Sequence, residues 1–493
     1  MTSRSPQFHV YEINTWAWLH ALSTAYGRTI TLANVPAEAV AHLASMDAVW
    51  LMGVWERSPA GRQVALEHPG LKKDYAHALP DHSPEDVIGS PYSVRRYEVD
   101  ERLGGTEGLA KFRKQITSLG LRLILDFVPN HVAIDHPWTI EHPDALVPGH
   151  PEHVAANPES YFQANGHILA HGRDPYFPAW TDTAQVNAFS QAYRDLSIDT
   201  LKSIASQCDG VRCDMAMLLV NRIFMHTWEQ TQVGAPPSTE YWEIIIPAVR
   251  EAHPDFLFMA EVYWDMEYEL QQQGFDYCYD KRLYDRLVHQ DAPSVEFHLV
   301  ADLSYQNQLM RFIENHDEPR ALSALGLPRS RMGAVLIATL PGGKLWHDGQ
   351  FEGRHIRLPV QLGRFPDEDK DSTLDSFYRR LLTEATSPVY RQGTWELRHT
   401  TPAWPENPTH HNLVAYSWRQ EHERRLVVVN FSSHRSQAYV SLPNLDLDGQ
   451  IWALTDILDD SVYERNGRQM AGDGLYIDLQ PWTAHIFNFN QAG

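Results

Sequence analysis

Short apolar runs recur along the chain, and each is followed by a longer segment whose apolar residues have helical spacing. The runs begin near Val10, Ala48, Leu121, Gly210, Phe256, Phe275, Met310 and Ala334. Short runs that are apolar on both faces are typical of buried parallel strands, and the helical segments between them complete βα units. Eight such units predict a closed parallel (β/α)8 TIM barrel, an α/β fold that builds its active site at the carboxyl ends of its strands.

Two segments do not fit the barrel pattern. The chain has 493 residues, which is more than one barrel core needs. The His- and Pro-rich segment 132–187 is too long for an ordinary βα loop and predicts an inserted subdomain after strand 3. Short alternating strands near the end predict a C-terminal antiparallel β-sandwich over 393–493. The catalytic barrel is then expected in two parts, residues 1–131 and 188–392.

Charge and cysteine content argue against several classes of partner. The net charge is −22, and no Lys/Arg run interrupts the acidic balance, which argues against nucleic acid or an anionic membrane surface. The three cysteines, Cys208, Cys213 and Cys278, show neither a disulfide framework nor zinc spacing, so we expect buried thiols in a reducing compartment. The first residues lack the apolar core of a secretory signal, and no stretch is long enough to span a bilayer. These features predict a cytoplasmic protein and leave the oligomeric state open.

Acids, histidines and arginines recur where the predicted strands end. They are Asp126, Asn130 and His131 in DFVPNH, Arg212 and Asp214 in GVRCD, Glu261 in MAEVYW, and His316, Asp317 and Arg320 in FIENHDEPR. Any one of these acids could be a structural ion-pair partner. Carboxylates from several strands of one barrel converge on one cavity, however, where burial and like charge push their proton affinities apart. Arg212 lies two residues before Asp214, so both side chains are expected on the same face.

These four segments, in this order, resemble the conserved regions of the α-amylase superfamily, glycoside hydrolase family 13. The resemblance covers nearly the whole chain, including the inserted subdomain and the sandwich. It implies that Asp214 is the nucleophile, that Glu261 is the general acid/base, and that Asp317 holds sugar hydroxyls and favours a distorted ring. The remaining residues that we assign to substrate binding are His131, Arg212, His316, Asp126, Arg320 and Tyr92. Among them, the resemblance implies that the two histidines bind sugar hydroxyls and that Arg212 keeps the nucleophile ionised.

Some of these assignments keep a structural alternative. Asp126 either braces Arg212 or forms an ordinary ion pair. Tyr92, in GSPYSVRRYEVD, resembles the family's sugar-stacking tyrosine, although a core tyrosine is the alternative. Ser93 stands where the family commonly has a carboxylate, so one sugar contact is expected to be missing or rebuilt. The residues Asp182, Gln185 and Asn187 either brace the site or cap turns.

Two departures from the family pattern bear on metal and substrate. Met215, Ala216, Met217 and Leu218 stand where many starch-degrading amylases end in Lys-His beside a structural calcium. Asn130 alone is far below the six to eight oxygens that calcium needs, so we predict no essential metal and no cofactor. After the eighth predicted strand, a polar cluster is expected at the barrel mouth, either as an acceptor pocket or as a solvated salt-bridged loop. Its members are Lys344, His347, Asp348, Arg354 and Arg357.

The resemblance implies a retaining α-glycoside hydrolase that acts on α-glucosidic bonds of oligosaccharides or α-glucans through a covalent glycosyl-enzyme intermediate. A transglycosylase of the same superfamily is the alternative, since it uses the same carboxylates and differs in acceptor subsites and water exclusion. A non-catalytic amylase-like binding or scaffold protein is more remote, because such proteins tend to lose the acids that survive here. A metal-dependent barrel hydrolase is more remote still. The expected partner is a carbohydrate substrate.

Overall fold

The computed structural model describes residues 7–229, 231, 233–447 and 449–491. Residues 1–6, which contribute to the expectation about a secretory signal, lie outside the described residues. The chain forms two compact units. The larger unit contains Val10–Tyr279 and Ile356–Asp367, and the smaller unit contains Met1–His9, Asp280–His355 and Glu368–Gly493. Within the described ranges, no helix combines the length and the apolar character needed to cross a bilayer.

Eight parallel strands close into a barrel, which confirms the predicted fold class. In chain order they are β1 (His9–Asn14), β2 (Ala48–Met52), β5 (Arg122–Phe127), β10 (Gly210–Cys213), β11 (Leu257–Ala260), β12 (Tyr277–Tyr279), β13 (Leu309–Arg311) and β14 (Gly343–His347). β10 pairs with β5 on one side and β11 on the other, and Arg212 stands opposite Asp126 of β5. This register brings the polar ends of three neighbouring strands to one edge.

The prediction for the eighth strand was wrong. The apolar run from Ala334 belongs to helix α15 (Ala321–Thr339), and the strand is β14, which follows it. Residues 332–339 are all buried, so this part of the helix is apolar on every side and its sequence resembles a buried strand. Periodicity cannot separate a short buried helix from a short buried strand. β14 itself contains Lys344 and His347, and these polar residues make its sequence resemble that of a loop.

Side-chain caps fix where several helices of the larger unit begin. Asn14, Ser58 and Ser190 each accept a backbone N–H from the first turn of the following helix. Glu240 and Glu243 form a reciprocal capping box at α10. The helices of this unit outside the inserted segment are α1 (Thr15–Tyr26), α2 (Ala37–Ala41), α3 (Pro59–Glu67), α4 (Pro69–Ala78), α5 (Gly105–Thr117), α8 (Gln191–Gln207), α9 (Asn221–Trp228), α10 (Tyr241–Ala252) and α11 (Glu267–Gln272).

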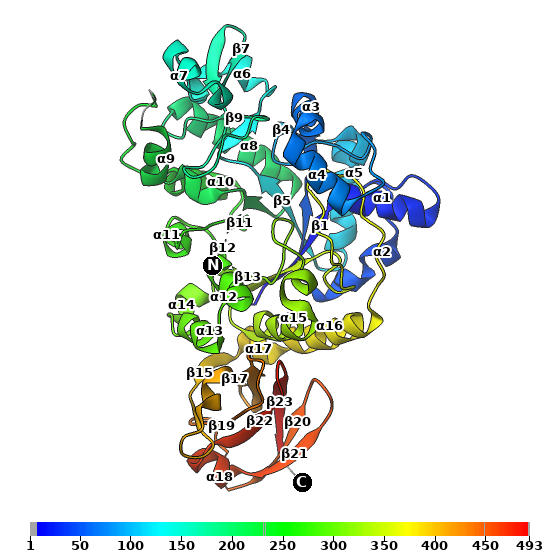
Figure 1. Ribbon diagram of the computed structural model, residues 1–493, viewed down its shortest axis with the longest axis vertical. Helices are drawn as coiled ribbons and strands as arrows, with labels where there is room; N and C mark the ends of the chain where they lie inside the picture. The colour runs from blue at the N-terminus through cyan, green and yellow to red at the C-terminus, as the bar shows by residue number, and fades with distance from the viewer. Residues whose placement is uncertain (1–6, 230, 232, 448, 492–493) are drawn as a thin grey trace. The chain divides into compact units, whose positions relative to one another are not determined.

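The segment between β5 and α8 has small elements of its own. β6 (His131–Ala133) pairs antiparallel with β9 (Thr183–Gln185) and closes the segment at its base. Between them lie α6 (Trp138–Glu141), α7 (Pro151–Ala156) and the hairpin β7 (Tyr161–Ala164) with β8 (His167–Ala170), and Figure 1 shows α6, α7 and β7 gathered together. A second antiparallel pair, β3 (Trp55–Arg57) and β4 (Val94–Val99), precedes this segment. The boundaries at 131/132, 187/188 and 392/393 stay predictions.

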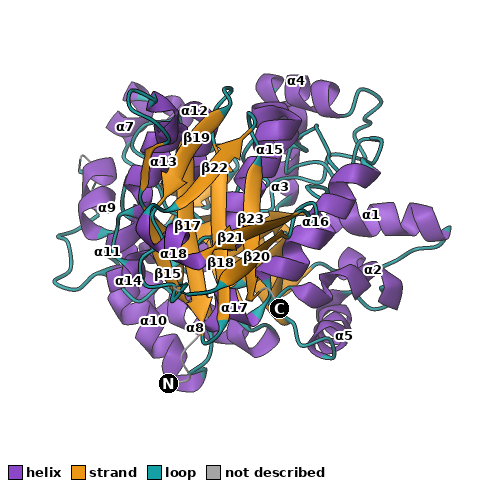
Figure 2. Cartoon of the chain, turned by 90° about the horizontal axis from the view of Figure 1, so that it is seen from below, coloured by secondary structure: helices purple, strands orange, loops and turns teal. Residues whose placement is uncertain are grey.

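The C-terminal part of the smaller unit is antiparallel, as predicted. A six-stranded sheet contains β15 (Thr394–Arg398), β17 (Leu413–Gln420), β18 (Glu423–Asn430), β23 (Ala484–Gln491), β20 (Ile451–Asp456) and β21 (Val462–Asn466). A three-stranded sheet contains β16 (Thr400–Pro402), β19 (Ser436–Val440) and β22 (Leu475–Leu479), and Figure 2 shows β19 beside β22. Apolar residues of both sheets, such as Val428 and Ile477, share one core, which defines a sandwich.

Helices connect the barrel strands of the smaller unit to this sandwich. They are α12 (Lys281–His289), α13 (Ala292–Leu299), α14 (Leu303–Gln306), α15, α16 (Ser372–Ala385) and α17 (Pro388–Gln392), with the short α18 (Gly467–Gly472) inside the sandwich. Asp280, Asp291 and Asp371 cap α12, α13 and α16, respectively.

Candidate active site

Arg212 is the centre of a buried charge network in the larger unit. Its Nη1 donates to Asp214 Oδ1 at 2.6 Å, and its Nη2 lies 2.8 Å from Glu261 Oε2. Asp126 Oδ1 lies 3.7 Å from the same guanidinium. The Arg212 side chain is fully buried, and the three carboxylate side chains are at most 8% exposed. The predicted contact between Arg212 and Asp214 is therefore present, and Glu261 shares it.

Aromatic rings surround the Arg212 guanidinium. Its carbon lies 5.3 Å from the ring centroid of Trp50, 5.1 Å from that of Tyr92 and 5.9 Å from that of Tyr279. Burial opposes the charged guanidinium, but the attraction of Glu261 and the other neighbouring acids outweighs it and raises the pKa of Arg212 well above its usual value. Arg212 is therefore a permanent cation, and it favours the ionised form of the carboxylates that it touches.

Glu261 has two further donors. The backbone N–H of Met215 donates to Oε2 at 2.6 Å, and the Tyr263 hydroxyl donates to Oε1 at 2.7 Å. Met215 adopts a left-handed conformation with φ 44°, which is rare for a residue with a side chain. The turn after Asp214 thus aims its N–H at the neighbouring acid, so both carboxylates are fixed relative to the same turn.

Asp126 is held from the opposite side. Its Oδ2 accepts the backbone N–H of Gly53 at 3.2 Å, and its backbone carbonyl accepts the Trp55 indole N–H at 2.8 Å. Gly53 has φ 78°, and a Cβ there would come within 2.6 Å of Arg57, so glycine is required for this approach. The environment of Asp126 fits the bracing role that the sequence offered as one of two alternatives.

His131 and Tyr92 lie together near the base of the inserted segment. Burial lowers the pKa of His131 to about 4, although a hydrogen bond to the backbone of Tyr92 opposes this shift, so the imidazole is neutral near pH 7. The His131 ring lies 5.1 Å from the Trp180 ring. Ser93 is buried, and its hydroxyl donates to the carbonyl of Asp182 at 2.7 Å, so it ties the loop to the inserted segment.

The amides near His131 bind one another. Gln185 Nε2 donates to Asn130 Oδ1 at 3.0 Å, and Asn130 Nδ2 donates to Gln185 Oε1 at 3.3 Å. Asn187 Nδ2 donates to the carbonyl of Val233 at 3.2 Å. The Gln185–Asn130 contacts fit the bracing alternative, because Asn130 directly precedes His131, whereas Asn187, whose Oδ1 accepts the backbone N–H of Phe189 at 3.1 Å, fits the turn-capping alternative. Within the described ranges, no group of three or more His, Cys, Asp or Glu side chains is arranged to hold a metal ion. The absence of an essential metal remains a prediction.

A second buried network lies after β13, in the smaller unit. Glu314 Oε1 accepts from Arg320 Nη1 at 2.6 Å, and Oε2 accepts the backbone N–H of Ala321 at 2.7 Å. Arg320 also contacts His347 Nδ1 at 2.8 Å. Burial opposes the charge of Glu314, but Arg320 and His347 outweigh it and lower the pKa of this carboxyl. Arg320 is 1% exposed, so its surroundings fit a positioning role better than sugar contact.

His316 and Asp317 lie on the turn that Glu314 begins. His316 Nε2 lies 2.9 Å from Asp317 Oδ2, and the backbone N–H of Asp317 donates to Asn315 Oδ1 at 3.0 Å. The Asp317 side chain is 42% exposed, whereas that of His316 is 3% exposed. A buried imidazole therefore orients a solvent-accessible carboxylate.

The polar cluster predicted around the eighth strand is not a single group at the barrel mouth. Lys344 is fully buried in the first half of β14, where its ammonium donates to the carbonyls of Leu340 and Gly342, each at 2.5 Å. Burial lowers the pKa of Lys344 well below its usual value. His347, at the far end of the strand, belongs to the Glu314 network instead. Lys344 is therefore a structural residue, and its inclusion in a polar cluster at the barrel mouth was wrong.

Sequence reasoning missed the contacts made by Tyr263, Gly53 and Glu314. The position of Tyr263 two residues after Glu261 was a usable signal, because residues at that spacing commonly face the same side.

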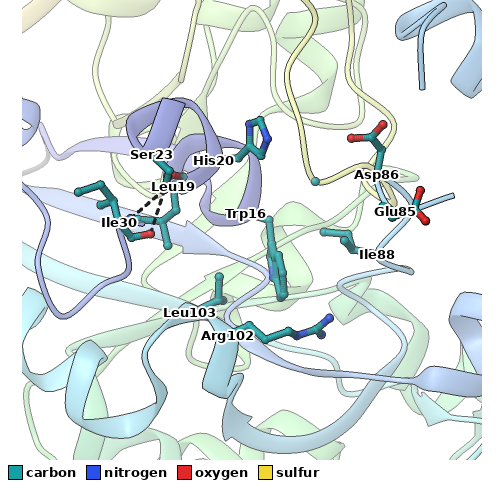
Figure 3. A pocket seen from close by; sticks show the side chains of 11 residues that line it. Trp16, Leu19, His20, Ser23, Ile30, Glu85, Asp86, Ile88, Arg102 and Leu103 are labelled. Carbon is teal, nitrogen blue, oxygen red and sulfur yellow. Dashed lines mark hydrogen bonds between the residues drawn. The ribbon is translucent and has the colours of Figure 1, made fainter. Parts of the chain in front are cut away.

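A pocket of about 250 Å³ around Trp16, shown in Figure 3, is lined by none of the predicted site residues. The Arg102 guanidinium lies 4.5 Å from the Trp16 ring there.

Comparison with known proteins identifies the family. The profile described as "Alpha amylase, catalytic domain" matches residues 45–355 of the chain. The chain therefore belongs to the α-amylase family, glycoside hydrolase family 13. The matched range includes the predicted catalytic acids in both compact units.

Two curated relatives and two solved structures illustrate the relationship. The chain is 25% identical to α-amylase MalA of Haloarcula japonica over 72% of its length and 48% of that protein. It is 26% identical to α-1,4-glucan:maltose-1-phosphate maltosyltransferase 2 of Streptomyces coelicolor over 82% of its length and 58% of that protein. The chain thus spans about half the length of these curated relatives.

The structures show the same fold along nearly the whole chain. A maltogenic α-amylase, AmyB, from Thermotoga neapolitana and an α-amylase from Geobacillus thermoleovorans in complex with acarbose each align with a TM-score of 0.68 and 18% identity. Each alignment covers 98% of both chains.

Proposed function

We propose that this protein is a retaining enzyme that acts on α-glucosidic bonds of oligosaccharides or α-glucans. Asp214 is the nucleophile, Glu261 is the general acid/base, and Asp317 holds sugar hydroxyls at the cleaved unit. The observation that carries the proposal is the shared guanidinium: Arg212 contacts Asp214 at 2.6 Å and Glu261 at 2.8 Å in a buried setting. A retaining glycosidase needs two carboxyl groups only about 5–5.5 Å apart, and one shared cation keeps two carboxylates close.

In the first step, an Asp214 oxygen attacks the anomeric carbon of the sugar. The new C–O bond forms as the glycosidic C–O bond breaks, and the leaving oxygen takes the proton of Glu261. Arg212 keeps Asp214 anionic and therefore nucleophilic. Glu261 must carry a proton at this stage, and the Tyr263 hydroxyl suits both forms because a phenol can donate to a carboxylate or accept from a carboxylic acid.

In the second step, Glu261 removes a proton from the incoming hydroxyl, whose oxygen attacks the anomeric carbon and releases Asp214. Two inversions give net retention. If the attacking hydroxyl belongs to water, the reaction is hydrolysis; if it belongs to a second sugar, the reaction is transglycosylation. Because one relative is named as a maltosyltransferase, transfer of a glycosyl group to a sugar is the second candidate function.

Sugar binding is assigned to the remaining predicted residues of each unit. Tyr92 stacks on the ring, while neutral His131 and the Asp317–His316 pair bind hydroxyls. His131 suits this role because burial lowers its pKa to about 4, so one ring nitrogen can accept and the other can donate near pH 7. Asp126 braces Arg212 in the larger unit, and Arg320 positions Glu314 in the smaller unit.

A substrate panel tests the proposal. The full chain is incubated with maltooligosaccharides, simple α-glucosides, sucrose and trehalose, and the products are separated by chromatography. Free glucose or maltose indicates water as acceptor, and oligosaccharides longer than the substrate indicate transfer. If the wild-type protein binds maltooligosaccharides but, like its Asp214→Asn variant, releases no product, the protein is instead an amylase-like binding protein.

We also propose a reducing, cytoplasmic compartment. Cys208, Cys213 and Cys278 are all buried free thiols, and burial raises the pKa of each, which keeps them inert. Fractionation of cells that express the protein tests this location, and recovery outside the cytoplasm would contradict it.

A further inference from the structure

Arg57 is a buried arginine that the proposed mechanism does not use. It is the last residue of β3, is 4% exposed, and donates from Nη1 to the carbonyls of Gly89 and Val360 at 2.5 and 3.0 Å. Its Nε and Nη2 are buried and have no hydrogen-bond partner among the described residues. Burial lowers the pKa of Arg57 to about 9, because it removes water from the charged guanidinium. A cation buried in this way costs stability, so packing alone does not account for it.

The end of β3 holds the loop that contains Tyr92 on both sides of this tyrosine. Gly89, whose carbonyl binds the Arg57 side chain, precedes Tyr92 by three residues. Ser58 follows Arg57, and its backbone N–H donates to the carbonyl of Ser93 at 3.2 Å. Two consecutive residues therefore fix the backbone before and after Tyr92.

Val360, the second partner of Arg57, comes from a segment that is distant in sequence. This segment, Ile356–Asp367, belongs to the larger unit. It pairs with the chain just before the Tyr92 loop, where Val87 and Leu362 form an antiparallel bridge. The Arg57 guanidinium thus joins the two segments at the point where this pairing ends.

The other end of the guanidinium lies against the backbone that supports Arg212. A Cβ at Gly53 would lie 2.6 Å from Arg57 Nη2, and the Gly53 N–H donates to Asp126. Asp126 in turn lies 3.7 Å from Arg212, and the ring centroid of Tyr92 lies 5.1 Å from the guanidinium carbon of Arg212. Arg57 therefore touches the backbone on the two sides that meet at the Tyr92 ring.

We propose that Arg57 is a positioning residue for Tyr92 and that it fixes the place of the Tyr92 ring at the cleaved sugar unit. This inference rests on the proposed function, in which Tyr92 stacks on that unit, and it adds a residue that no sequence motif assigned. Stacking requires the two rings to meet face to face at contact distance, so a loop shift of about 1 Å weakens it. A loop that is fixed before binding also loses less entropy when the sugar binds.

A double-mutant cycle with Tyr92 separates positioning from simple stabilisation. Arg57→Met removes both hydrogen bonds of the side chain. We expect it to raise KM for maltotriose about fivefold with little change in kcat, and we expect Arg57→Lys to raise KM less, because an ammonium still reaches one carbonyl. In the Tyr92→Ala background, Arg57→Met should raise KM no further, since the ring that it positions is gone.

Arg424→Met is the matched control for this cycle. Arg424 is a buried arginine of the sandwich, and it also donates to main-chain carbonyls, those of Leu445 and His422. Its replacement should lower Tm and leave KM for maltotriose unchanged. An equal rise of KM in Arg424→Met would show that loss of stability alone explains the effect of Arg57→Met, and it would overturn the positioning role.

Direct binding distinguishes failure of this inference from failure of the proposed function. Calorimetric titration of the Asp214→Asn full chain with maltotriose should show the same non-additive effects on Kd. Additive effects of Arg57→Met and Tyr92→Ala overturn the positioning role even if the wild type is active. Non-additive effects, together with a wild type that releases no product, support the positioning role and refute the enzymatic function. Absence of any binding overturns both. If Arg57→Met does not fold, Arg57→Gln replaces it in the cycle, and an unchanged Kd in that variant also overturns the role.

Discussion

Replacing Tyr263 with phenylalanine tests the environment of Glu261 with a minimal change. The hydroxyl donates to Glu261 Oε1 at 2.7 Å, and Tyr263→Phe removes only that oxygen. A hydrogen bond to a charged group contributes about 1.5–3 kcal/mol, against about 0.5–1.5 kcal/mol for a neutral one. The substitution therefore removes about 1–1.5 kcal/mol more stabilisation from the ionised form of Glu261 than from its protonated form. Since one pH unit corresponds to about 1.36 kcal/mol, the proton should stay on Glu261 to about one pH unit higher.

The pH profile of kcat/KM reports this change. Its alkaline limb marks loss of the proton from the general acid of the free enzyme, so we expect that limb to move up by about one unit in Tyr263→Phe, with a smaller change in the acidic limb. Tyr476→Phe, which removes the hydroxyl of an exposed tyrosine on β22 of the sandwich, is the matched control and should leave both limbs in place. An unmoved alkaline limb in Tyr263→Phe, with wild-type rates, would show that Glu261 is not the group that donates the proton.

Three further predictions concern stacking, metal and acid stability. Tyr92→Ala should raise KM for maltooligosaccharides while Tyr92→Phe largely preserves it, because stacking needs the ring; equal damage from both would make the hydroxyl the working part. EDTA should leave activity and Tm nearly unchanged, since the buried Leu218 replaces a calcium-region histidine; a loss restored by calcium would refute this. Burial lowers the pKa of His136 to about 3. Below about pH 6.5 the unfolded chain therefore binds more protons than the folded chain, so the free energy of unfolding decreases as the pH falls from about 6.5 toward 3. In urea titrations between pH 6.5 and 4.5, His136→Asn should remove about 2–3 kcal/mol of that fall, and an unchanged pH dependence would count against a neutral buried His136.

Most of the barrel could be predicted because buried parallel strands have a distinctive pattern. Seven runs, from Val10 to Met310, coincide with barrel strands. The eighth strand could not be found this way, since its lysine is satisfied by two backbone carbonyls that only the folded chain provides. The fully buried part of α15, by contrast, lacks the polar stripe that identifies most helices.

Within the candidate site, the residues on strands were easier to predict than those on turns. The spacing of Arg212 and Asp214 and the alignment of β5, β10 and β11 are properties of regular strands. The donors to Glu261 come from irregular backbone, namely the left-handed Met215 and the loop that carries Tyr263. Their positions depend on tertiary packing, which periodicity does not encode.

The stereochemistry of azide rescue tests the roles of Asp214 and Glu261 most directly. With α-glucosyl fluoride, Glu261→Ala should still form the β-linked intermediate, because fluoride needs little protonation, and azide should then release α-glucosyl azide. Asp214→Gly should lose activity by several orders of magnitude, and azide in the vacated space should give β-glucosyl azide. The anomeric coupling in proton NMR distinguishes the two products. Exchanged products would reverse the two assignments, and near-wild-type turnover in both variants without azide would contradict a catalytic role for either carboxylate.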